Sequence, residues 1–193
     1  MHGRKVCSLC LGALRTNISR KETIRVIVNT KEFNENLNRL QRKDYTALEE
    51  IYNEYYSLLY ITAYSICNNK ADAEDIADSV IHKLIRLNDI PYIDNPKGYL
   101  YTLAINAAKN HVKQQREIPL TFAEQCETQM DFDSRLNIEE CLAKLTDIEK
   151  TIVIEYVFAG YKFHEIAKRH NISLSTVKRK YKKAKEFLQA IWK

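Results

Sequence analysis

The stretch that decides the fold runs from residue 163 to residue 178 and reads FHEIAKRHNISLSTVK. It has the form of a helix-turn-helix, in which two short helices cross at a tight turn. Ala167 supplies the small residue needed at the crossing, and Asn171 tolerates the left-handed backbone of the turn better than most residues. Ser173 can cap the second helix. Apolar residues flank the turn on both sides: Ile166, Ile172 and Val177.

The second helix of this motif, at about residues 174–190, separates apolar from basic side chains. The apolar stripe recurs in steps of four and three at Val177, Tyr181, Ala184, Leu188 and Ile191. In a major groove, the N-terminal end of such a helix contacts base edges and its flank contacts phosphates. A solvated basic face on a bundle helix is the alternative, but the adjacent turn favours DNA binding. We therefore expect DNA contacts from Ser175, Thr176, Lys178, Arg179, Lys182 and Lys183.

The composition predicts an all-α fold. The chain has 193 residues but only 4 Gly and 3 Pro, and neither occurs between Ala13 and Ile90. Strand-and-turn architectures need such residues at regular intervals. Glycine-rich phosphate-binding loops are also missing from the sequence, which argues against nucleotide-binding enzymes. The longest nearly apolar stretch, 58–67, is far shorter than the roughly 20 residues of a membrane span. We expect a cytoplasmic protein without membrane insertion.

Charge is unevenly distributed along the chain, whose formal net charge is +5. Residues 70–96 carry a net charge of −3 and residues 97–116 carry +4. Residues 117–149 carry −7 and residues 160–193 carry +8. Such segregation differs from uniform solubilising charge and points to separate basic surfaces.

Helix start signals divide the chain into two helical domains. Asp44, Asn69, and Asn95 followed by Pro96 are predicted starts, and Thr146 with Glu149 forms a capping box. The expected helices run over about 44–67, 69–87, 96–116, 146–158, 163–169 and 174–190. We predict an N-terminal extension at 1–30, a first helical domain at 31–117, a flexible acidic linker at 118–134, and the helix-turn-helix domain at 135–193.

Three stretches resemble bacterial RNA polymerase sigma factors of the extracytoplasmic-function type. Residues 72–81, DAEDIADSVI, resemble the family pattern D-A-E-D-L-x-Q-E-V-F, with Asp78 and Ser79 in place of Gln-Glu. Residues 98–106, GYLYTLAIN, are similar to the W-L-Y-x-I-A-x-N helix that follows in the family. Residues 145–187 are similar to the family's promoter-reading helix-turn-helix. The resemblance covers about residues 40–190 in the correct order.

The resemblance implies core RNA polymerase, through its clamp coiled coil and flap, and promoter DNA as partners. It leaves open whether an anti-sigma factor also binds. The helix at 70–87 would dock on the clamp, and its outward side chains are the expected polymerase contacts: Asp75, Asp78, Ser79, His82 and Arg86. Without the resemblance, solvated helix polarity would be the preferred interpretation of these residues.

The next helix and the loop before it would read and melt the minus-ten element, while the helix-turn-helix would read the minus-thirty-five element. Amide, hydroxyl and basic side chains suit base and phosphate contacts, and an aromatic side chain can hold an unstacked base. Tyr92 can equally be a core aromatic. The expected DNA contacts are Tyr92, Thr102, Asn106, Lys109, Asn110 and Lys113.

Other candidate sites carry less support. Cys7-x-x-Cys10 with His2 has metal-like spacing, but a second Cys/His pair that would complete a zinc site is missing. Residues 1–27 can instead lie upstream of the biological start, with Val28 as an alternative start. We find no catalytic constellation and expect neither enzymatic activity nor a metal or cofactor. The alternatives are a stand-alone helix-turn-helix regulator and an adaptor that binds other proteins.

Overall fold

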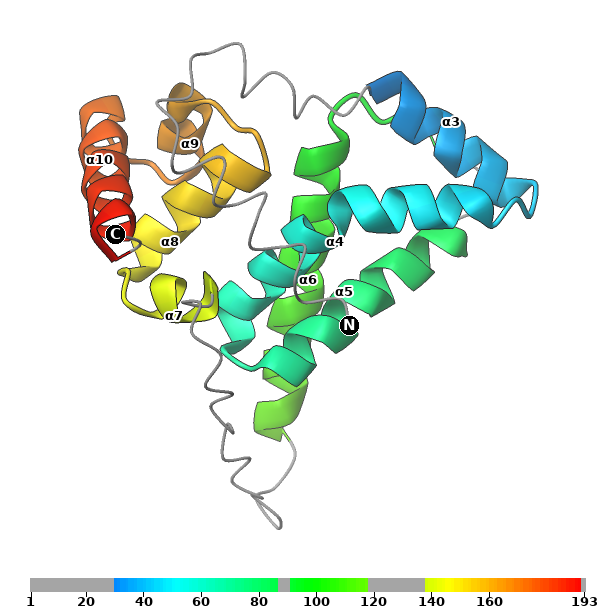
Figure 1. The fold of residues 1–193 in the computed structure, drawn as a ribbon, viewed down its shortest axis with the longest axis horizontal. Helices are drawn as coiled ribbons and strands as arrows, with labels where there is room; N and C mark the ends of the chain where they lie inside the picture. Colours follow the sequence, from blue (N-terminus) through cyan, green and yellow to red (C-terminus); the bar gives the residue numbers. More distant parts are fainter. Residues whose placement is uncertain (1–29, 87–90, 118–137, 192–193) are drawn as a thin grey trace.

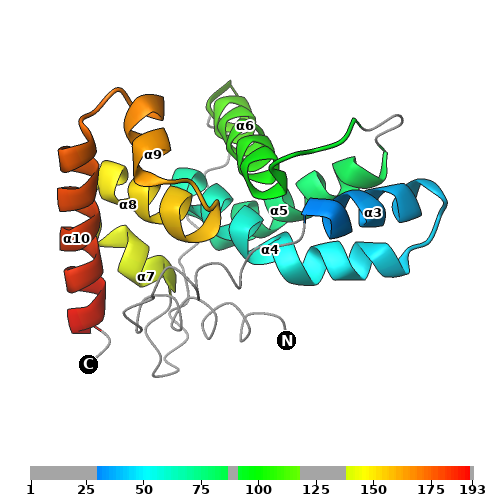
Figure 2. The same ribbon diagram turned by 90° about the horizontal axis from the view of Figure 1, so that it is seen from above.

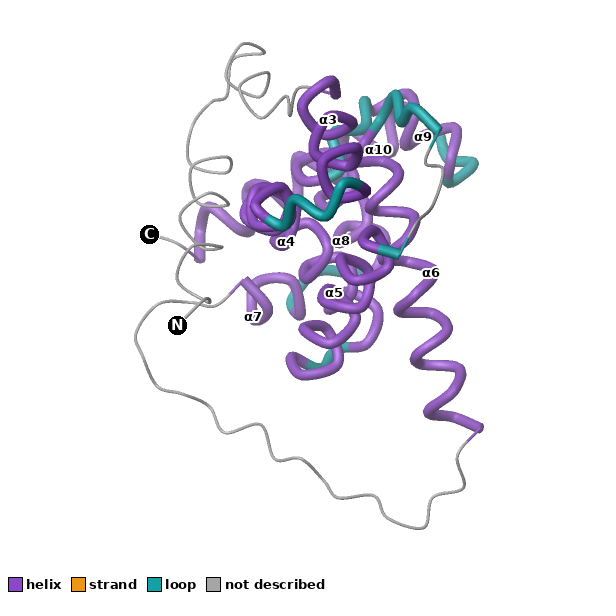
Figure 3. Tube along the Cα trace, turned by 90° about the vertical axis from the view of Figure 1, so that its right-hand side faces the viewer, coloured by secondary structure: helices purple, strands orange, loops and turns teal. Residues whose placement is uncertain are grey.

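The computed structural model describes residues 30–86, 91–117 and 138–191, and this described part of the chain is helical without any strand (Figure 3). The predicted all-α fold is therefore confirmed. The predicted linker 118–134 and residues 1–29 lie outside the described residues. The elements are α3 (Thr30–Gln41), α4 (Thr46–Cys67), α5 (Lys70–Ile85), α6 (Pro96–Glu117), α7 (Ile138–Ala143), α8 (Asp147–Val153), the π-helix η2 (Ile154–Phe158), α9 (Phe163–Arg169) and α10 (Leu174–Ile191).

Helices α3–α6 form an N-terminal module, in which side-chain caps set the helix starts. The Asn69 side chain accepts a hydrogen bond from the Asp72 backbone N–H at 3.2 Å, and Asn95 accepts one from Gly98 at 3.0 Å. Both predicted starts are confirmed. The Asp44 carboxylate accepts from the Thr46 backbone N–H at 3.1 Å. Helix α4 therefore begins two residues after Asp44.

The core of the N-terminal module forms around α4, which packs against α3, α5 and α6 (Figure 1). The predicted stripe on α5 is buried at Ile76, Val80 and Leu84, while Leu87 lies outside the described residues. Ile51 and Leu59 of α4 are also fully buried. Burial of such apolar side chains stabilises each by about 1.5–3 kcal/mol relative to exposure.

Helices α7–α10, including η2, form a C-terminal module. The Glu149 carboxylate accepts a hydrogen bond from the Thr146 backbone N–H at 3.1 Å, as the predicted capping box requires. The helix that starts there widens into a π-helix at Ile154 and ends before Gly160, whose φ of 74° favours glycine. Ile152, Ile166 and Val177 are completely buried and form the helix-turn-helix core.

The turn of the helix-turn-helix has the predicted geometry. Asn171 adopts φ 52°, and the Ser173 hydroxyl accepts a hydrogen bond from the Thr176 backbone N–H at 3.1 Å. Ala167, at the crossing, is 9% exposed. The turn therefore has the left-handed residue and the cap hydrogen bond that its residue types predict.

The two modules lie side by side and share one hydrophobic core (Figures 1 and 2). Helix α4 contacts both α7 and η2. Leu142 and Ile154 of the C-terminal module belong to the same buried cluster as Leu59 and Leu100. This contact differs from the expected arrangement of two domains joined by a linker, and it could not be predicted because it unites residues far apart in the sequence.

Candidate nucleic-acid interface

The predicted DNA-contacting side of α10 faces solvent. Val177, Ala184 and Leu188 are buried, and Tyr181 is half-buried. On the opposite side, Thr176 is half-buried and the other candidate residues are exposed: Ser175, Lys178, Arg179, Lys182 and Lys183. The predicted separation of apolar and basic faces is confirmed.

Contacts within the protein distinguish the basic residues of α10 from one another. The Lys183 ammonium lies 3.7 Å from the buried Glu149 carboxylate, and Lys182 lies 3.8 Å from Glu186. Hydrogen bonds from Thr146, and to a smaller extent the charge of Lys183, lower the pKa of Glu149. In the part of the chain that the structure describes, no carboxylate forms an ion pair with Lys178 or Arg179. These two side chains therefore offer the least neutralised charge near the start of α10.

Helix α6 presents a second polar surface. The candidate residues all lie on its solvent side: Thr102, Asn106, Lys109, Asn110 and Lys113. The Thr102 hydroxyl donates to the Gly98 carbonyl at 2.8 Å, so it is already engaged with the backbone. From Pro96 to Arg116 the helix carries no acidic residue. No carboxylate of this stretch of α6 itself would therefore repel a phosphate backbone.

Tyr92, in the loop before α6, is 64% exposed. The alternative prediction that Tyr92 is a core aromatic is therefore wrong. The neighbouring Ile93 is buried, and its backbone is bracketed by Asn34 of α3. The Asn34 amide donates to the Ile93 carbonyl at 3.0 Å, and its oxygen accepts from the Ile93 N–H at 2.8 Å. Sequence reasoning missed Asn34, and the sole signal was its position on the buried side of α3 beside Phe33.

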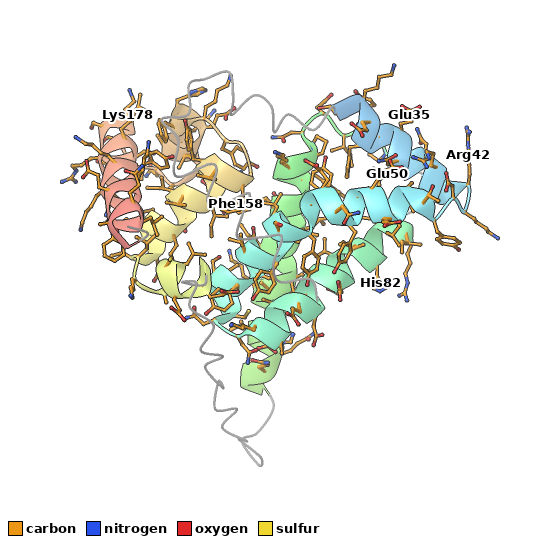
Figure 4. The ribbon with its side chains drawn as sticks, in the orientation of Figure 1. Glu35, Arg42, Glu50, His82, Phe158 and Lys178 are labelled. Atoms are coloured by element: carbon orange, nitrogen blue, oxygen red, sulfur yellow. The ribbon has the colours of Figure 1, made fainter. Side chains whose placement is uncertain are left out.

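Helix α5 carries a third surface. Its candidate residues are exposed, as predicted: Asp75, Asp78, Ser79, His82 and Arg86. The Ser79 hydroxyl donates to the Ile76 carbonyl at 2.8 Å. Figure 4 shows His82 of α5 and Lys178 of α10 on opposite sides of the molecule. A partner on α5 and DNA on α10 could therefore bind together without competing.

Sequence reasoning also missed a set of buried polar groups between the modules. The Tyr60 hydroxyl of α4 donates to Glu139 of α7 at 2.8 Å. Arg169 links Tyr101 of α6 to Glu155 of η2, which is completely buried: its guanidinium lies 5.8 Å from the centre of the Tyr101 ring, and its Nε lies 3.2 Å from the Glu155 carboxylate. Burial, reinforced by Glu155, raises the pKa of Tyr101. Helix periodicity alone does not reveal Tyr101, because it assigns a single buried side to α6, whereas Tyr101 packs against Tyr161 of the C-terminal module.

The described residues include no group of three or more His, Cys, Asp or Glu side chains placed to hold a metal ion. Among them, no helix is long and apolar enough to cross a membrane. Burial raises the pKa of the Cys67 thiol, which opposes formation of the nucleophilic thiolate. His2, Cys7, Cys10 and Cys126 lie outside the described residues.

Comparison with protein families relates both modules to one family. The model for Sigma-70 region 2 matches residues 51–118, and the model for Sigma-70, region 4 matches residues 135–188. The chain belongs to the sigma-70 family. A region 2 followed directly by a region 4 of this kind is the organisation of its extracytoplasmic-function type. Comparison with curated proteins found no match.

Family membership gives this sigma factor a role in promoter recognition together with RNA polymerase, in a family of non-catalytic initiation factors. The region 2 match spans the two surfaces on α5 and α6, and the region 4 match spans the helix-turn-helix.

Proposed function

We propose that this sigma factor binds core RNA polymerase through α5 and directs it to promoters with two separate DNA-reading helices. The exposed N-terminal end of α10 reads the minus-thirty-five element in the major groove. The polar side of α6 contacts the minus-ten element, and Tyr92 stacks on a base withdrawn from the duplex. All chemistry stays with the polymerase in the cytoplasm, and no metal or cofactor takes part.

The observation that carries this proposal is the separation of three exposed polar surfaces on one apolar core. Each of α5, α6 and α10 buries its apolar side and leaves its candidate contacts in solvent. The reading helices are basic, whereas α5 presents Asp75 and Asp78. A carboxylate surface repels DNA phosphates and suits a protein partner with basic side chains. We assign residues 31–117 to the polymerase-binding and melting domain and 135–193 to the upstream-reading domain.

The first prediction tests the polymerase surface by charge reversal. The D75K/D78K variant should fold normally, because both residues are exposed, and it should bind core polymerase at least tenfold more weakly because repulsion replaces attraction. Competition against wild-type protein for limiting core measures the loss.

A matched control is E35K/E49K, which makes the same charge change at exposed positions on α3 and α4. It should bind core like the wild type. Equal binding by D75K/D78K would mean that α5 does not dock on the polymerase. A wild-type protein that binds promoter DNA but never core would instead identify a stand-alone regulator.

A further inference from the structure

An exposed leucine begins α10, the helix proposed to read the upstream element. Leu174 is 41% exposed, and it is one of four large apolar residues left in solvent in the part of the chain that the structure describes. Steps of three and four residues would extend the buried stripe of α10 from Val177 back to Leu174. Among the described residues, however, the buried helix-turn-helix cluster and the partly buried side chains packed on it do not include Leu174. Core packing therefore does not explain an apolar residue at this position.

The first turn of α10 is also unusual in its charge. It contains no Asp or Glu, although carboxylates near a helix N-terminus interact favourably with the helix dipole. The next turn exposes two cations, Lys178 and Arg179. A turn that lacks carboxylates and is followed by cations suits an approach to the polyanionic DNA backbone. The side chains of this turn can therefore come close to DNA without repulsion from a carboxylate among them.

The hydroxyl groups at the start of α10 do not by themselves distinguish one base pair from another. The Ser173 Oγ lies 2.9 Å from the Ser175 Oγ and 2.8 Å from the Thr176 Oγ1, and it accepts from the Thr176 N–H at 3.1 Å. These contacts use the one donor and two acceptor sites of the Ser173 hydroxyl. Ser175 and Thr176 keep further capacity, but a hydroxyl both donates and accepts and so suits any base. Selectivity in this turn therefore depends on the remaining side chain, Leu174.

We infer that Leu174 selects thymine in the upstream element by packing on its 5-methyl group. The inference rests on the proposed function, because it requires α10 to enter the major groove. Among the four ordinary bases, only thymine presents a methyl group in that groove, and apolar side chains contact it there.

Lys178 is the neighbour of Leu174 on the same side of the helix, one turn later. Side chains spaced in this way have Cβ atoms about 5–6 Å apart, and successive base pairs are about 3.4 Å apart along the duplex. Leu174 and Lys178 therefore contact base pairs one or two steps apart. Their different chemistry, one apolar and one cationic, would make a thymine close to a base read by Lys178 part of the upstream element.

The test compares thymine with uracil, which lacks only the 5-methyl group. The full-length protein with core polymerase first selects duplexes from random DNA, and the upstream one of the enriched blocks gives the element. Each thymine of that element, on either strand, is then replaced singly by uracil in synthetic duplexes that compete for the complex. One replacement should weaken binding of the wild-type complex about fourfold, the factor expected for burial of one methyl group.

Three variants assign this effect to a side chain. L174A should bind the thymine duplex more weakly and should respond less than about 1.5-fold to uracil, because the partner of the methyl group is lost. L174M keeps an apolar side chain and should restore the response to uracil. The matched control is F187A, since Phe187 is 38% exposed on the same helix and lies about 20 Å further along its axis. F187A should respond to uracil like the wild type.

Two results would overturn the inference and leave the reading role of α10 intact. One is a wild-type complex that selects an upstream element but is insensitive to uracil at every position, which needs no variant to interpret. The other is an L174A complex that keeps the wild-type response. A wild-type complex that enriches no upstream element would instead refute the proposed function, and the inference with it.

Discussion

At the scale of single residues, polar side chains set the loop that carries Tyr92. The side-chain amide of Asn34 donates to the Ile93 carbonyl and accepts from the Ile93 N–H. Because Ile93 is buried, its N–H and carbonyl cannot turn to water instead. Tyr92 therefore projects from a loop whose next residue is fixed, which would reduce the entropy lost in the proposed stacking of Tyr92 on a base.

Replacing Asn34 with Ala should destabilise the protein by about 2 kcal/mol, because two buried hydrogen bonds are lost and their backbone partners stay unsatisfied. Thermal unfolding measures the loss. N38A, at an exposed asparagine one turn later on the same helix, should cost less than about 0.5 kcal/mol. Equal stability of the two variants would show that the bracket around Ile93 contributes nothing.

Lys178 and Arg179 allow a sharper test of DNA reading. An alanine substitution that removes a bidentate base contact should cost about 1–3 kcal/mol at one base pair, and one that removes a phosphate contact should lower the salt slope by about one. Core binding should be unchanged in both variants.

Upstream-element titrations of the polymerase complex with K178A and R179A at several salt concentrations measure both quantities. R42A removes an exposed arginine from the turn after α3 and serves as the control. If both α10 variants select promoters like R42A, α10 is not the reading helix.

At the scale of elements, most helix boundaries could be predicted from the sequence. Caps are local signals, so the helix starts at Asn69, Asn95 and Thr146 can be predicted without knowledge of the fold. The π-helix at 154–158 could not be predicted in this way. It positions Glu155 among Arg169, His170 and Tyr101, and these partners come from other parts of the chain. The burial of Tyr101 on α6 could not be predicted for the same reason.

Helix α6 should contribute to strand opening more than to duplex binding. In the polymerase complex, N106A/N110A should still form the closed promoter complex but open it more slowly, because exposed amides suit contacts to unstacked bases. Permanganate reactivity of unpaired thymines measures opening. Q114A, at an exposed amide on the same helix, is the control. Normal opening with weakened duplex binding in N106A/N110A would contradict the melting role.

At the scale of the whole molecule, the two modules are distinct in sequence but share part of one core. Order, charge and turn chemistry predicted two helical domains, and helix periodicity predicted which side of each helix is exposed. The partners proposed for those exposed sides came from the resemblance to sigma factors. The contact between modules could not be predicted, because it depends on tyrosines that an isolated helix pattern assigns to a single core. Tyr60 satisfies that pattern and also donates to Glu139 of the other module, while Tyr101 also packs edge to face on Tyr161 of that module.

A fragment of residues 135–193 should keep its helix-turn-helix but lose α7. The core of Ile152, Ile166 and Val177 lies within the fragment, whereas Leu142 of α7 is buried in the cluster that includes α4. A helix of six residues is not stable alone. Hydrogen–deuterium exchange should show fast exchange of α7 amides in the fragment and slow exchange in the full chain. Equal protection would mean that α7 does not depend on the N-terminal module.

The shared core also limits how this protein can be recombined with others. A chimaera that joins its residues 31–117 to the C-terminal half of another protein inherits Tyr60 without its acceptor Glu139, and Tyr101 without Tyr161 and Arg169 beside it. Two buried tyrosine side chains would then face a foreign surface, and the two halves of the graft would pack together differently or not at all. Designers of synthetic regulators who exchange halves at the linker would therefore change the resting state together with the DNA preference. A glutamate at position 139 must accompany Tyr60, and Tyr161 with Arg169 must accompany Tyr101.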